Sequence, residues 1–398
     1  MKATQQQTKE YNRNLALKTI FDHVSTSRAE IARITGLTRT TVSDIVNDLL
    51  AEGLVSEVGV GSSIGGKSPI LLSIVDDSRW MIGLDLAQQQ FQGAVVNLRG
   101  KIRTKVSLPV NDRNGDDALT QVYEILDLLV AAAEGPLIGI GVGTPGLVNS
   151  REGVVVNAVN LDWKDLPLAK LLQERYHLPV SILNDSQAAA MGEYVFGSGQ
   201  SAEGNLAVIN VRHGIGSGII INGQLFVGDG GGAGEIGHVV VVPEGGLPCR
   251  CGNHGCLETV ASAHALIKRA QALAASSSDT QLPRNAPEID LATVEWAYAG
   301  GDPLVRAMVL DTAHYMGMAI TGLIGILNIQ RIVLAGDMTC FGKPWLDAIQ
   351  KTIAQNTFSR LLQNTKVEIG QLGANTIILG ASATLASNYS LLFNCTSS

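Results

Sequence analysis

Residues 234–258 contain two short motifs, Gly234-Glu235-Ile236-Gly237-His238 and, eleven positions after the histidine, Cys249-Arg250-Cys251-Gly252-Asn253-His254-Gly255-Cys256-Leu257-Glu258. Three of the chain's five cysteines therefore fall within eight residues. In a chain without an export signal, such clustering favours a metal site over disulfides. Three sulfurs and one nitrogen, from His238 or His254, form the closed tetrahedral donor set typical of a structural Zn²⁺. Reduced structural cysteines beside a core histidine are the alternative interpretation.

The composition predicts a large soluble protein. Its 398 residues exceed one ordinary domain, and 45% are hydrophobic and 16% charged. No run of about 18 apolar residues indicates a membrane span. The polar segment Met1–Arg13 lacks the apolar core of a secretory signal. We therefore expect a cytoplasmic protein without a membrane partner.

Charge is distributed unevenly along the chain. Residues 1–75 carry eight Lys/Arg and seven Asp/Glu, whereas the remainder carries 21 and 29. The net negative charge of the whole chain argues against a protein that coats nucleic acid without sequence preference. A near-neutral N-terminal segment can still bind DNA if its basic residues share one face.

A helix-turn-helix pattern occupies residues 27–50. Ser27 and Glu30 form a capping-box pattern before a short helix, Gly36 supplies a turn, and Thr38 is a good N-cap for a second helix. That helix carries one apolar stripe, Val42, Ile45, Val46, Leu49 and Leu50. Such modules read the major groove from the start of the second helix. The expected DNA-contacting residues there are Arg39, Thr40, Thr41, Ser43 and Asn47.

Two strand-like runs, residues 54–60 and 70–74, follow the second helix. They bracket a glycine-rich tip with one cation, Lys67, suited to contact phosphate or the minor groove. An earlier helix over residues 14–24 supplies the third packing partner through Leu15, Leu17, Ile20 and Phe21. Residues 1–75 therefore read as a winged helix-turn-helix DNA-binding domain. A small protein-interaction bundle is the alternative.

Beyond residue 75, one α/β pattern occurs twice. The first set has β-type runs at 80–86, 92–97 and 101–109, a helix at 118–133 and a strand at 137–143. The second has runs at 206–211, 216–221 and 224–227, a helix at 305–327 and a strand at 332–335. This repetition predicts two related α/β lobes. We place the first at 76–200 and the second, with the metal site, at 201–398, with the C-terminal helix as a candidate to return to the first lobe.

Further motifs complete a family pattern. Gly143-Thr144-Pro145-Gly146 closes a buried strand, Asn184-Asp185 ends another, and Gly214-Ile215-Gly216-Ser217-Gly218 is a glycine-rich turn. With the Gly-His and Cys-x-Cys-Gly-x-x-Gly-Cys-x-Glu motifs, they resemble the ROK family of repressors and sugar kinases. The winged domain and the Asn12-Arg13-x-x-x-Leu17 pattern extend the resemblance over essentially the whole chain, to ROK repressors of the xylose-repressor and N-acetylglucosamine-repressor type.

The resemblance implies an actin-like, hexokinase-like two-lobed fold, and it favours His238 over His254 as the zinc ligand. It also implies that five residues contact sugar hydroxyls, namely Asn184, Asp185, Glu235, His238 and Glu258. Further candidates for the pocket wall are Gly143, Thr144 and Asn160. Polar side chains suit this role, because a hydroxyl both donates and accepts hydrogen bonds and unpaired partners are costly. A histidine with one ring nitrogen on zinc and the other on a hydroxyl would connect the two sites.

Three departures from the kinases of the family argue against enzyme activity, although Asp185 matches their general base. Those kinases place a Gly-Gly-Thr-Lys type turn after the first strand, where this chain has three glutamines, residues 88–90. Arg212-His213-Gly214-Ile215-Gly216 stands where those kinases tend to have Gly-Thr-Gly in their second phosphate turn. Asp337 puts a carboxylate where nucleotide phosphates would lie. We therefore expect no catalytic residue, with Asp185 as an acceptor for a sugar hydroxyl.

The resulting hypothesis is a sugar-responsive transcriptional repressor of carbohydrate-utilisation genes. A homodimer or tetramer would present its winged domains to double-stranded operator DNA and release it when a monosaccharide binds. A ROK-type sugar kinase and a repressor controlled by a protein partner are the alternatives. Xylose, glucose, N-acetylglucosamine and rarer hexoses all suit the polar set.

Overall fold

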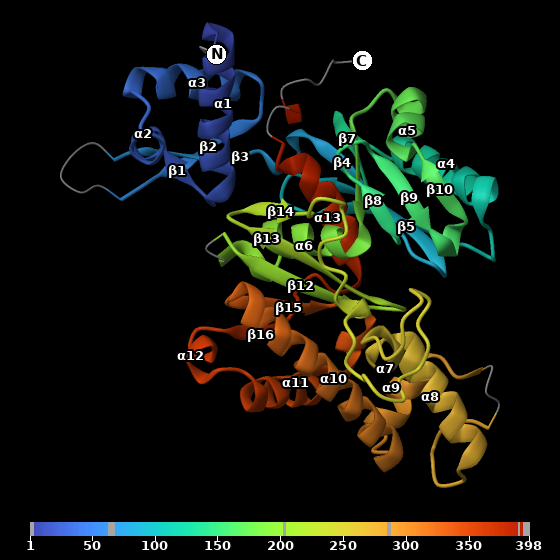
Figure 1. Cartoon of the computed structure of the whole chain (residues 1–398). Coiled ribbons are helices and arrows are strands. Elements are labelled where there is room, and N and C mark those ends of the chain that lie inside the picture. The colour runs from blue at the N-terminus through green and yellow to red at the C-terminus, as the bar shows by residue number, and fades with distance from the viewer. Residues whose placement is uncertain (1–3, 63–67, 202–203, 285–287, 389–390, 393–398) are drawn as a thin grey trace.

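The computed structural model describes residues 4–62, 68–201, 204–284, 288–388 and 391–392. These residues form a small N-terminal domain attached to a larger body built around two five-stranded sheets (Figure 1). The expected fold class, a winged helix-turn-helix followed by a two-lobed α/β body, is confirmed.

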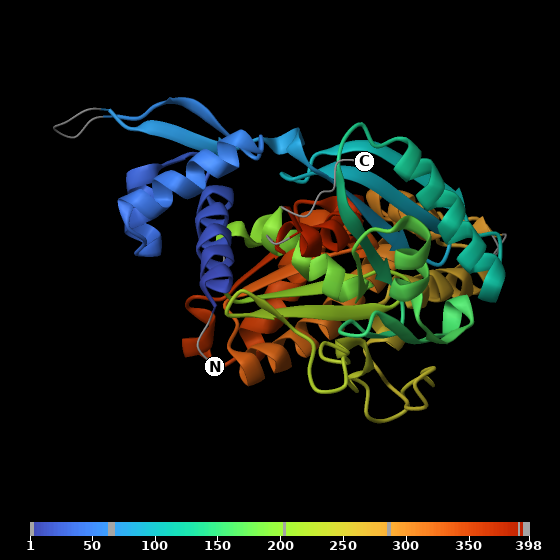
Figure 2. The same cartoon turned by 90° about the horizontal axis from the view of Figure 1, so that it is seen from above.

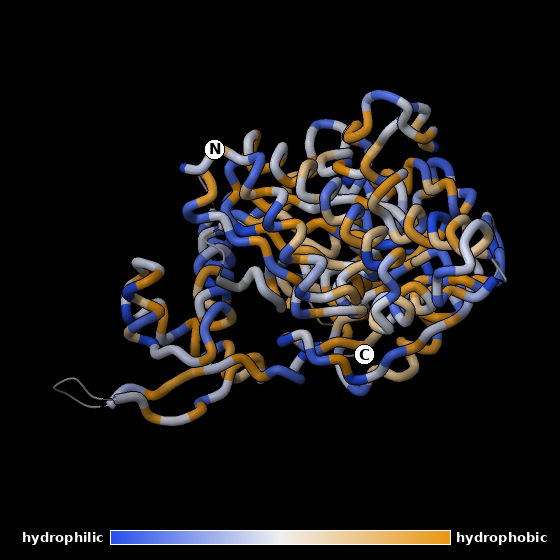
Figure 3. Tube along the Cα trace, turned by 90° about the horizontal axis from the view of Figure 1, so that it is seen from below, coloured by the Kyte–Doolittle hydropathy of each residue, from blue (hydrophilic) through white to orange (hydrophobic). Residues whose placement is uncertain are grey.

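The N-terminal domain combines three helices with a three-stranded sheet. The helices are α1 (Gln5–Asp22), α2 (Arg28–Thr35) and α3 (Arg39–Ala51). The strands are β1 (Thr26–Ser27), β2 (Val55–Val60) and β3 (Ile70–Ile74), with β3 in the middle. The hairpin of β2 and β3 is the wing, and it projects away from the body (Figures 2 and 3). The core of the N-terminal domain contains most of the predicted apolar residues of the three helices, including Leu17, Ile20, Ile31, Val42 and Val46. Leu15 was also expected there but is only half-buried.

Helix α1 begins earlier than its apolar pattern predicts. It starts at Gln5 instead of Asn14, because Thr4 and Gln7 form a reciprocal capping box before it. The expected start was wrong because the added turns are almost entirely exposed and carry no apolar stripe. Capping chemistry, and not burial, sets this end of the helix.

The observed N-caps of α2 and α3 agree more closely with the caps predicted from the sequence. Ser27 accepts the amide of Glu30 at 3.2 Å, as expected. The expected return bond from Glu30 to Ser27 is replaced by an ion pair with Arg33 at 2.6 Å. Thr38 caps α3 as predicted and accepts the amide of Thr41 at 3.1 Å.

The two sheets of the body share one topology. The first contains β4 (Trp80–Leu86), β5 (Gln90–Asn97), β6 (Ile102–Pro109), β7 (Leu137–Thr144) and β11 (Val180–Asn184), in the order β11-β7-β4-β5-β6. The second contains β12 (Leu206–Val211), β13 (Ile215–Ile221), β14 (Gln224–Phe226), β15 (Arg331–Ala335) and β16 (Lys366–Ile369), in the order β14-β13-β12-β15-β16. In each sheet, three antiparallel strands are continued by two strands paired in parallel. The two lobes therefore contain the same sheet topology, as the repeated sequence pattern predicted.

Helices cover both sheets, as Figure 1 shows. Around the first sheet lie α4 (Gly115–Ala131), α5 (Leu168–Tyr176), α6 (Asp185–Val195) and α13 (Thr376–Ala386), together with a small sheet of β8 (Leu147–Asn149), β9 (Val154–Ala158) and β10 (Trp163–Leu166). Beside the second lie α7 (Glu258–Ala261), α8 (Ala263–Ser276), α9 (Leu291–Ala299), α10 (Pro303–Leu327), α11 (Gly342–Asn356) and α12 (Ser359–Leu362).

Helix α10 is long and apolar enough to cross a membrane by length and composition. In this structure one face of the helix enters the core of the second lobe, where Val309, Met316 and Ile320 are fully buried. Trp345 of α11 is buried in the same core and donates its Nε1 hydrogen to Thr312 Oγ1 at 3.1 Å. Core packing accounts for this face only, because Leu310, Met318 and Ile326 of the same helix are exposed.

Helix α13 packs in backbone contact with α6 and with the first sheet. A Cβ on Gly380 of α13 would lie 1.7 Å from the carbonyl oxygen of Ala188 in α6. A Cβ on Gly83 or Gly141 would lie 2.1 or 2.0 Å from a carbonyl oxygen of α13. Only glycine permits such close approach. The last helix therefore returns to the first sheet after the chain has formed the second lobe.

Candidate functional site

Four side chains converge where the Gly-His motif meets the cysteine-rich loop. His238 ends a 3-10 turn (Ile236–His238), and the cysteines lie on the loop before α7. The ligand atoms of His238, Cys249, Cys251 and Cys256 all lie within 4.8 Å of one another. The histidine of this group is therefore His238, whereas His254 forms an isolated backbone bridge with Pro248.

The spacing of these donor atoms suits a tetrahedral ion. His238 Nδ1 lies 3.5 Å from Cys249 Sγ, and Cys251 Sγ lies 3.6 Å from Cys256 Sγ. Metal–sulfur bonds of about 2.3 Å in a tetrahedron place two sulfurs about 3.8 Å apart. The Cys249 amide donates to the Asn253 carbonyl at 2.8 Å, which folds the loop back on itself. The four side chains could therefore hold a metal ion.

The second ring nitrogen of His238 faces a different group. His238 Nε2 lies 3.8 Å from Glu235 Oε2, and about half of the Glu235 side chain (51%) remains exposed. The Nδ1 edge of the imidazole therefore points toward the sulfurs, and the Nε2 edge points toward a carboxylate. This is the arrangement expected of a histidine shared between two sites.

Asn184 and Asp185 are positioned by the junction of β11 and α6. The side-chain oxygen of Asn184 caps α6 by accepting the Ser186 amide at 2.9 Å, and its Nδ2 donates to the Gly146 carbonyl at 2.9 Å. Asp185 Oδ1 accepts the Ser186 amide at 2.7 Å. Both side chains are consequently held in place where the strand ends and the helix begins.

Glu258 begins α7, two positions after Cys256. Its Oε2 accepts the amide of Ile215 at 3.1 Å. Gly214 lies so close that a Cβ there would be 2.5 Å from the same oxygen. The predicted glycine-rich turn, residues 214–218, is wrong beyond Gly214, because residues 215–218 belong to β13. The junction of Gly214 with β13 fixes the Glu258 carboxylate beside the cysteine loop.

The predicted sugar-binding residues act on one another electrostatically. Burial raises the pKa of Asp185, although the nearby Arg212 opposes the increase. Burial also raises the pKa of Glu235; His238 lowers this pKa, whereas Asp185 and Glu258 raise it further. The structure thus brings together the set that we call the polar site, Asn184, Asp185, Glu235, His238 and Glu258.

A half-buried arginine next to the polar site joins the two lobes. Arg212 follows β12 in the second lobe, and its Nη1 donates to both carboxylate oxygens of Asp85 in β4, at 3.1 and 2.9 Å. Its Nε lies 3.8 Å from Asp337 Oδ1. Burial raises the pKa of Asp85 to about 6; Arg212 opposes this, whereas Asp185 and Asp337 add to it.

Sequence reasoning noted Arg212 and Asp337 only as departures from the kinase pattern and did not predict that they meet. One signal was present: Asp85 is a carboxylate inside an otherwise apolar strand, and it is 2% exposed. Carboxylates are almost never fully buried without a partner. Such a position predicts a cation nearby but does not say which one.

Arg250, between two of the cysteines, makes a second contact across the body. Its Nη1 donates to Asn160 Oδ1 at 3.0 Å, and its Nη2 lies 3.3 Å from His213 Nε2. Because arginine can only donate, this nitrogen of His213 accepts. Burial and the neighbouring His264 and Arg250 lower the pKa of His213 to about 4, which agrees with a neutral ring. Asn160, a candidate for the pocket wall, therefore accepts a hydrogen bond from the cysteine loop.

The predicted DNA-reading residues lie on α3. Arg39, Thr40 and Asn47 are exposed, and Ser43 is half-buried. Half-buried Thr41 has its Oγ1 2.9 Å from Thr38 Oγ1, within the helix cap. Lys67 lies outside the described residues.

One basic residue beside this face was missed. Arg28, at the start of α2, donates to Asn47 Oδ1 at 3.4 Å and pairs with Glu57 of the wing at 3.4 Å. It follows the cap residue Ser27 directly, and its contact with α3 could not be read from local sequence.

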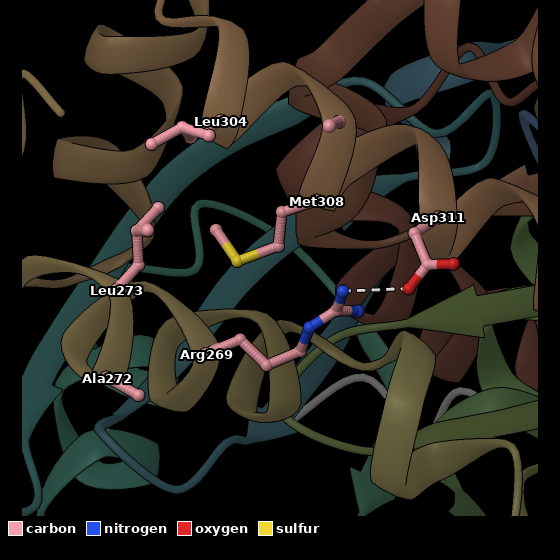
Figure 4. A pocket seen from close by; sticks show the side chains of 7 residues that line it. Arg269, Ala272, Leu273, Leu304, Met308 and Asp311 are labelled. Atoms are coloured by element: carbon pink, nitrogen blue, oxygen red, sulfur yellow. Dashed lines mark hydrogen bonds and ion pairs between the residues drawn. The ribbon is translucent and has the colours of Figure 1, made fainter. Parts of the chain in front are cut away.

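An open, mostly apolar groove of about 520 Å³ lies between α8 and α10 (Figure 4). Leu273 and Met308 line it, and Arg269 pairs with Asp311 at 2.7 Å along one side. Its lining shares no residue with the polar site or the cysteine loop. We assign no ligand to this groove.

The fold and these sites define a two-lobed, sugar-kinase-like body that carries a winged DNA-binding domain. A sequence profile described as "ROK family" matches residues 81–388, and one described as "Winged helix-turn-helix DNA-binding" matches residues 12–56. The chain belongs to the ROK family.

Individual relatives include both regulators and kinases. The chain is 32% identical over 388 residues to a xylose repressor from Caldicellulosiruptor bescii, covering 96% of each chain. It is 33% identical over 309 residues to a glucokinase from Halalkalibacterium halodurans, covering 76% of this chain and 93% of that one. A crystal structure described as a ROK family transcriptional regulator, homologous to the E. coli MLC protein, superposes with a TM-score of 0.84 at 26% identity and covers 97% of this chain and 98% of that one.

Proposed function

We propose that this chain is a transcriptional repressor that binds operator DNA and responds to a monosaccharide. One observation carries the proposal: a single chain combines an exposed recognition helix with a polar site of sugar-binding type. Its similarity to a xylose repressor covers 96% of this chain and therefore includes most of the DNA-binding domain, whereas its similarity to a glucokinase covers 76%.

We assign the DNA-binding domain to residues 1–75, the first lobe to 76–200 and the second lobe to 201–398. The short 3-10 segment η1 (Asp76–Ser78) would then be the junction between the winged domain and the first lobe. Helix α13 would belong with the first lobe, because it packs against β4, β7 and α6.

In this proposal the polar site binds sugar hydroxyls. Asp185, Glu235 and Glu258 supply acceptors, and Asn184 supplies an amide that both donates and accepts. Asp185 accepts a hydroxyl hydrogen without acting as a general base. Removing such a buried partner should cost about 1–3 kcal/mol of binding free energy.

The cysteine loop would hold one structural Zn²⁺ per chain. His238, Cys249, Cys251 and Cys256 supply all four positions of a tetrahedral ion, which leaves none open for catalysis. The bound ion would contribute folding free energy and fix the His238 ring. The loop ends two residues before Glu258, so its order would also orient that carboxylate.

Kinase activity is not part of this proposal, although relatives include a glucokinase. Arg212 occupies the turn that would approach phosphates, and it is already paired with Asp85. Asp337 adds a negative charge at the corresponding turn of β15, which would repel a nucleotide. A kinase would instead require sugar-dependent consumption of ATP.

A repressor of this kind is expected to act as a homodimer or tetramer in the cytoplasm. Two-fold assemblies place two recognition helices in half-sites about one helical turn apart, or multiples of that distance. Sedimentation of the purified protein with and without operator DNA would measure the assembly.

Fluorescence anisotropy with the DNA upstream of the chain's own gene tests the function directly. The complex is titrated with xylose, glucose and N-acetylglucosamine. Salt-dependent, specific binding that one sugar releases supports the proposal. Binding that no sugar changes moves control to a protein partner, and absent DNA binding together with sugar-dependent ATP consumption replaces the proposal with a kinase.

The pocket is tested in the same assay with Asp185→Ala. This variant should bind DNA but respond to the sugar about 5- to 150-fold more weakly. Asp347→Ala, which removes an exposed carboxylate on α11, is the matched control. Normal release of DNA from the Asp185 variant would contradict the assigned pocket.

A further inference from the structure

The turn between β5 and β6, residues 97–100, binds the end of the first helix of the DNA-binding domain. The Arg99 guanidinium donates to the carbonyl oxygens of Phe21 and His23, the latter at 3.1 Å. It also lies 5.0 Å from the centre of the Phe21 ring. Helix α1 ends at Asp22, so these carbonyls are at the negative end of the helix dipole, where a cation is stabilising.

The same turn holds the junction between the two domains. The Leu98 amide donates to the Asp76 carbonyl at 3.0 Å, and Asn97 Nδ2 donates to Asp77 Oδ1 at 2.7 Å. Arg99 Nε lies 3.6 Å from Asp76 Oδ1. Asn97 is 2% exposed, so this attachment is part of the buried structure.

On its other side, the turn touches the end of α6. A Cβ on Gly100 would lie 2.8 Å from two ring carbons of Phe196, and Gly100 has a φ of +79°. Phe196 is the C-cap residue of α6, and its amide donates to the Gly192 carbonyl at 2.8 Å. The Phe196 ring therefore packs directly against Gly100, the residue that follows Arg99.

The opposite end of α6 lies in the polar site. Asn184 is the N-cap of the helix and Asp185 its first residue. At 1.5 Å per residue, its 11 residues span about 16 Å. One rigid element thus has a proposed sugar contact at its start and the turn at its end.

Helix α6 also packs tightly against both lobes. A Cβ on Gly218 of β13 would lie 2.4 Å from the carbonyl oxygen of Ser186 and 2.4 Å from the Cβ of Ala190. On the side of α13, a Cβ on Gly192 would lie 2.5 Å from the Thr376 carbonyl. Packed elements of this kind move as units and do not deform continuously.

We propose that the 97–100 turn is the joint that transmits the state of the polar site to the DNA-binding domain. A change at Asp185 displaces α6, Phe196 carries the displacement to Gly100, and Arg99 carries it to the end of α1. Apolar packing supports the connection, because Leu17, Ile20 and Phe21 of α1 belong to the same buried cluster as Val96 and Leu98. Arg99 is a positioning residue, which touches neither DNA nor sugar.

This inference rests on the proposed function, and reciprocity allows a test without knowing the sugar. If the polar site biases DNA binding, DNA binding must bias the polar site by the same free energy. Hydrogen–deuterium exchange of residues 180–196 is therefore measured in the full-length protein, with and without the upstream DNA. Anisotropy on the same samples reports whether DNA is bound.

Arg99→Ala is compared with Arg103→Ala, which removes an exposed arginine of β6 that pairs only with Glu134 among the described residues. We expect DNA to change exchange over residues 180–196 in the wild type and in Arg103→Ala. In Arg99→Ala, DNA should still bind and the change should be lost. A change that persists in Arg99→Ala, or is absent from a DNA-bound wild type, overturns the inference.

Two further results distinguish a failure of this inference from unfolding of the variant and from a failure of the proposed function. If Arg99→Ala unfolds the DNA-binding domain, Gly100→Ala replaces it, because the added methyl group displaces Phe196 without removing the bonds to α1. Unchanged coupling in Gly100→Ala overturns the proposed route. A wild type that binds no upstream DNA rejects the proposed function first, and this inference with it.

Discussion

Arg212 Nη1 lies 2.9 Å from Asp85 Oδ2 and 3.1 Å from Asp85 Oδ1, so the end of β12 in the second lobe is tied to β4 in the first. The two residues are 127 positions apart in the chain. Asp337, from the segment after β15, lies 3.8 Å from the same guanidinium. In this chain a protein cation and two carboxylates meet near Asp185, with which Arg212 and Asp85 interact electrostatically.

Breaking this pair should destabilise the body. Arg212→Ala leaves the Asp85 carboxylate buried without its partner, and we expect a loss of about 2–4 kcal/mol in the free energy of unfolding. That value is below the usual cost for a fully buried pair because the Arg212 side chain is 22% exposed. Urea unfolding followed by tryptophan fluorescence measures the change.

Two comparisons identify the cause of that loss. Lys343→Ala removes an exposed ion pair with Asp347 and should change stability by less than about 1 kcal/mol. Adding Asp85→Asn to Arg212→Ala should restore part of the stability, because the unpaired buried charge is gone. Equal effects of the two single cation deletions would refute the role of the buried pair.

The pH dependence of stability should carry the signature of Asp85. Its pKa is raised from 3.8 to about 6 by burial, so the folded protein holds a proton that the unfolded chain has lost between these values. Stability contributed by this group is therefore present below pH 4 and declines as the pH rises to about 6, by roughly 3 kcal/mol.

Asp85→Asn cannot titrate and isolates this contribution. Between pH 4 and pH 6, the wild type should lose stability relative to the variant, and above about pH 7 the difference should be constant. Unfolding free energies at half-unit pH intervals provide the measurement. Parallel curves over the whole range would show that Asp85 titrates normally.

Loss of the proposed zinc should weaken both the fold and the polar site. Chelation or Cys256→Ser should lower the unfolding temperature, because metal affinity in such a site is folding free energy. Sugar affinity should fall too, because His238 and Glu258 lose their support. Elemental analysis should find one zinc per chain in the wild type and in Cys340→Ser, a control cysteine outside the cluster. A Cys256→Ser protein that keeps its zinc would reject the ligand assignment.

Arg39→Ala should weaken DNA binding and leave sugar binding unchanged. Arg39 is exposed at the start of α3, and loss of one base or phosphate contact costs about 1–3 kcal/mol. Anisotropy at several salt concentrations distinguishes the two kinds of contact, because loss of a phosphate contact lowers the salt slope by about one. Lys351→Ala on α11 is the charge-matched control, and an equal loss in both variants would point to general electrostatics.

Two helical glycines should respond in opposite directions to the same substitution. In Gly380→Ala the added carbon would lie 1.7 Å from the Ala188 carbonyl oxygen, so α13 and α6 must separate. We expect a loss of about 3 kcal/mol or more. Gly322→Ala on α10 meets no atom within 4 Å and should stabilise by up to about 1 kcal/mol. Thermal unfolding of both variants measures the contrast, and a neutral Gly380→Ala would argue against backbone contact of the two helices.

Much of the fold could be predicted because it depends on local patterns. Short β-type runs placed residues 70–74 and 80–86 within their observed strands without error. Thr38 marked the start of the recognition helix correctly. The start of α1 was missed, because polar turns held by a capping box carry no apolar periodicity.

The candidate site was predictable as a set of residues but not as a geometry. Cysteine spacing indicated a metal-binding loop, and spacing alone left His238 and His254 as equal choices. The folded chain places His238 with the cysteines and directs its other nitrogen toward Glu235. Family motifs supplied the remaining members of the polar site.

The sequence by itself determined several helices and strands, the sulfur donors of the cysteine loop and the motifs of the ROK family. These depend on residues a few positions apart, whose relation is set by backbone periodicity and spacing. Tertiary structure alone decided that Arg212 meets Asp85 and that Arg99 caps the end of α1. Such pairs lie many tens of residues apart, and only the packing of the lobes and the DNA-binding domain brings their charges within reach of one another.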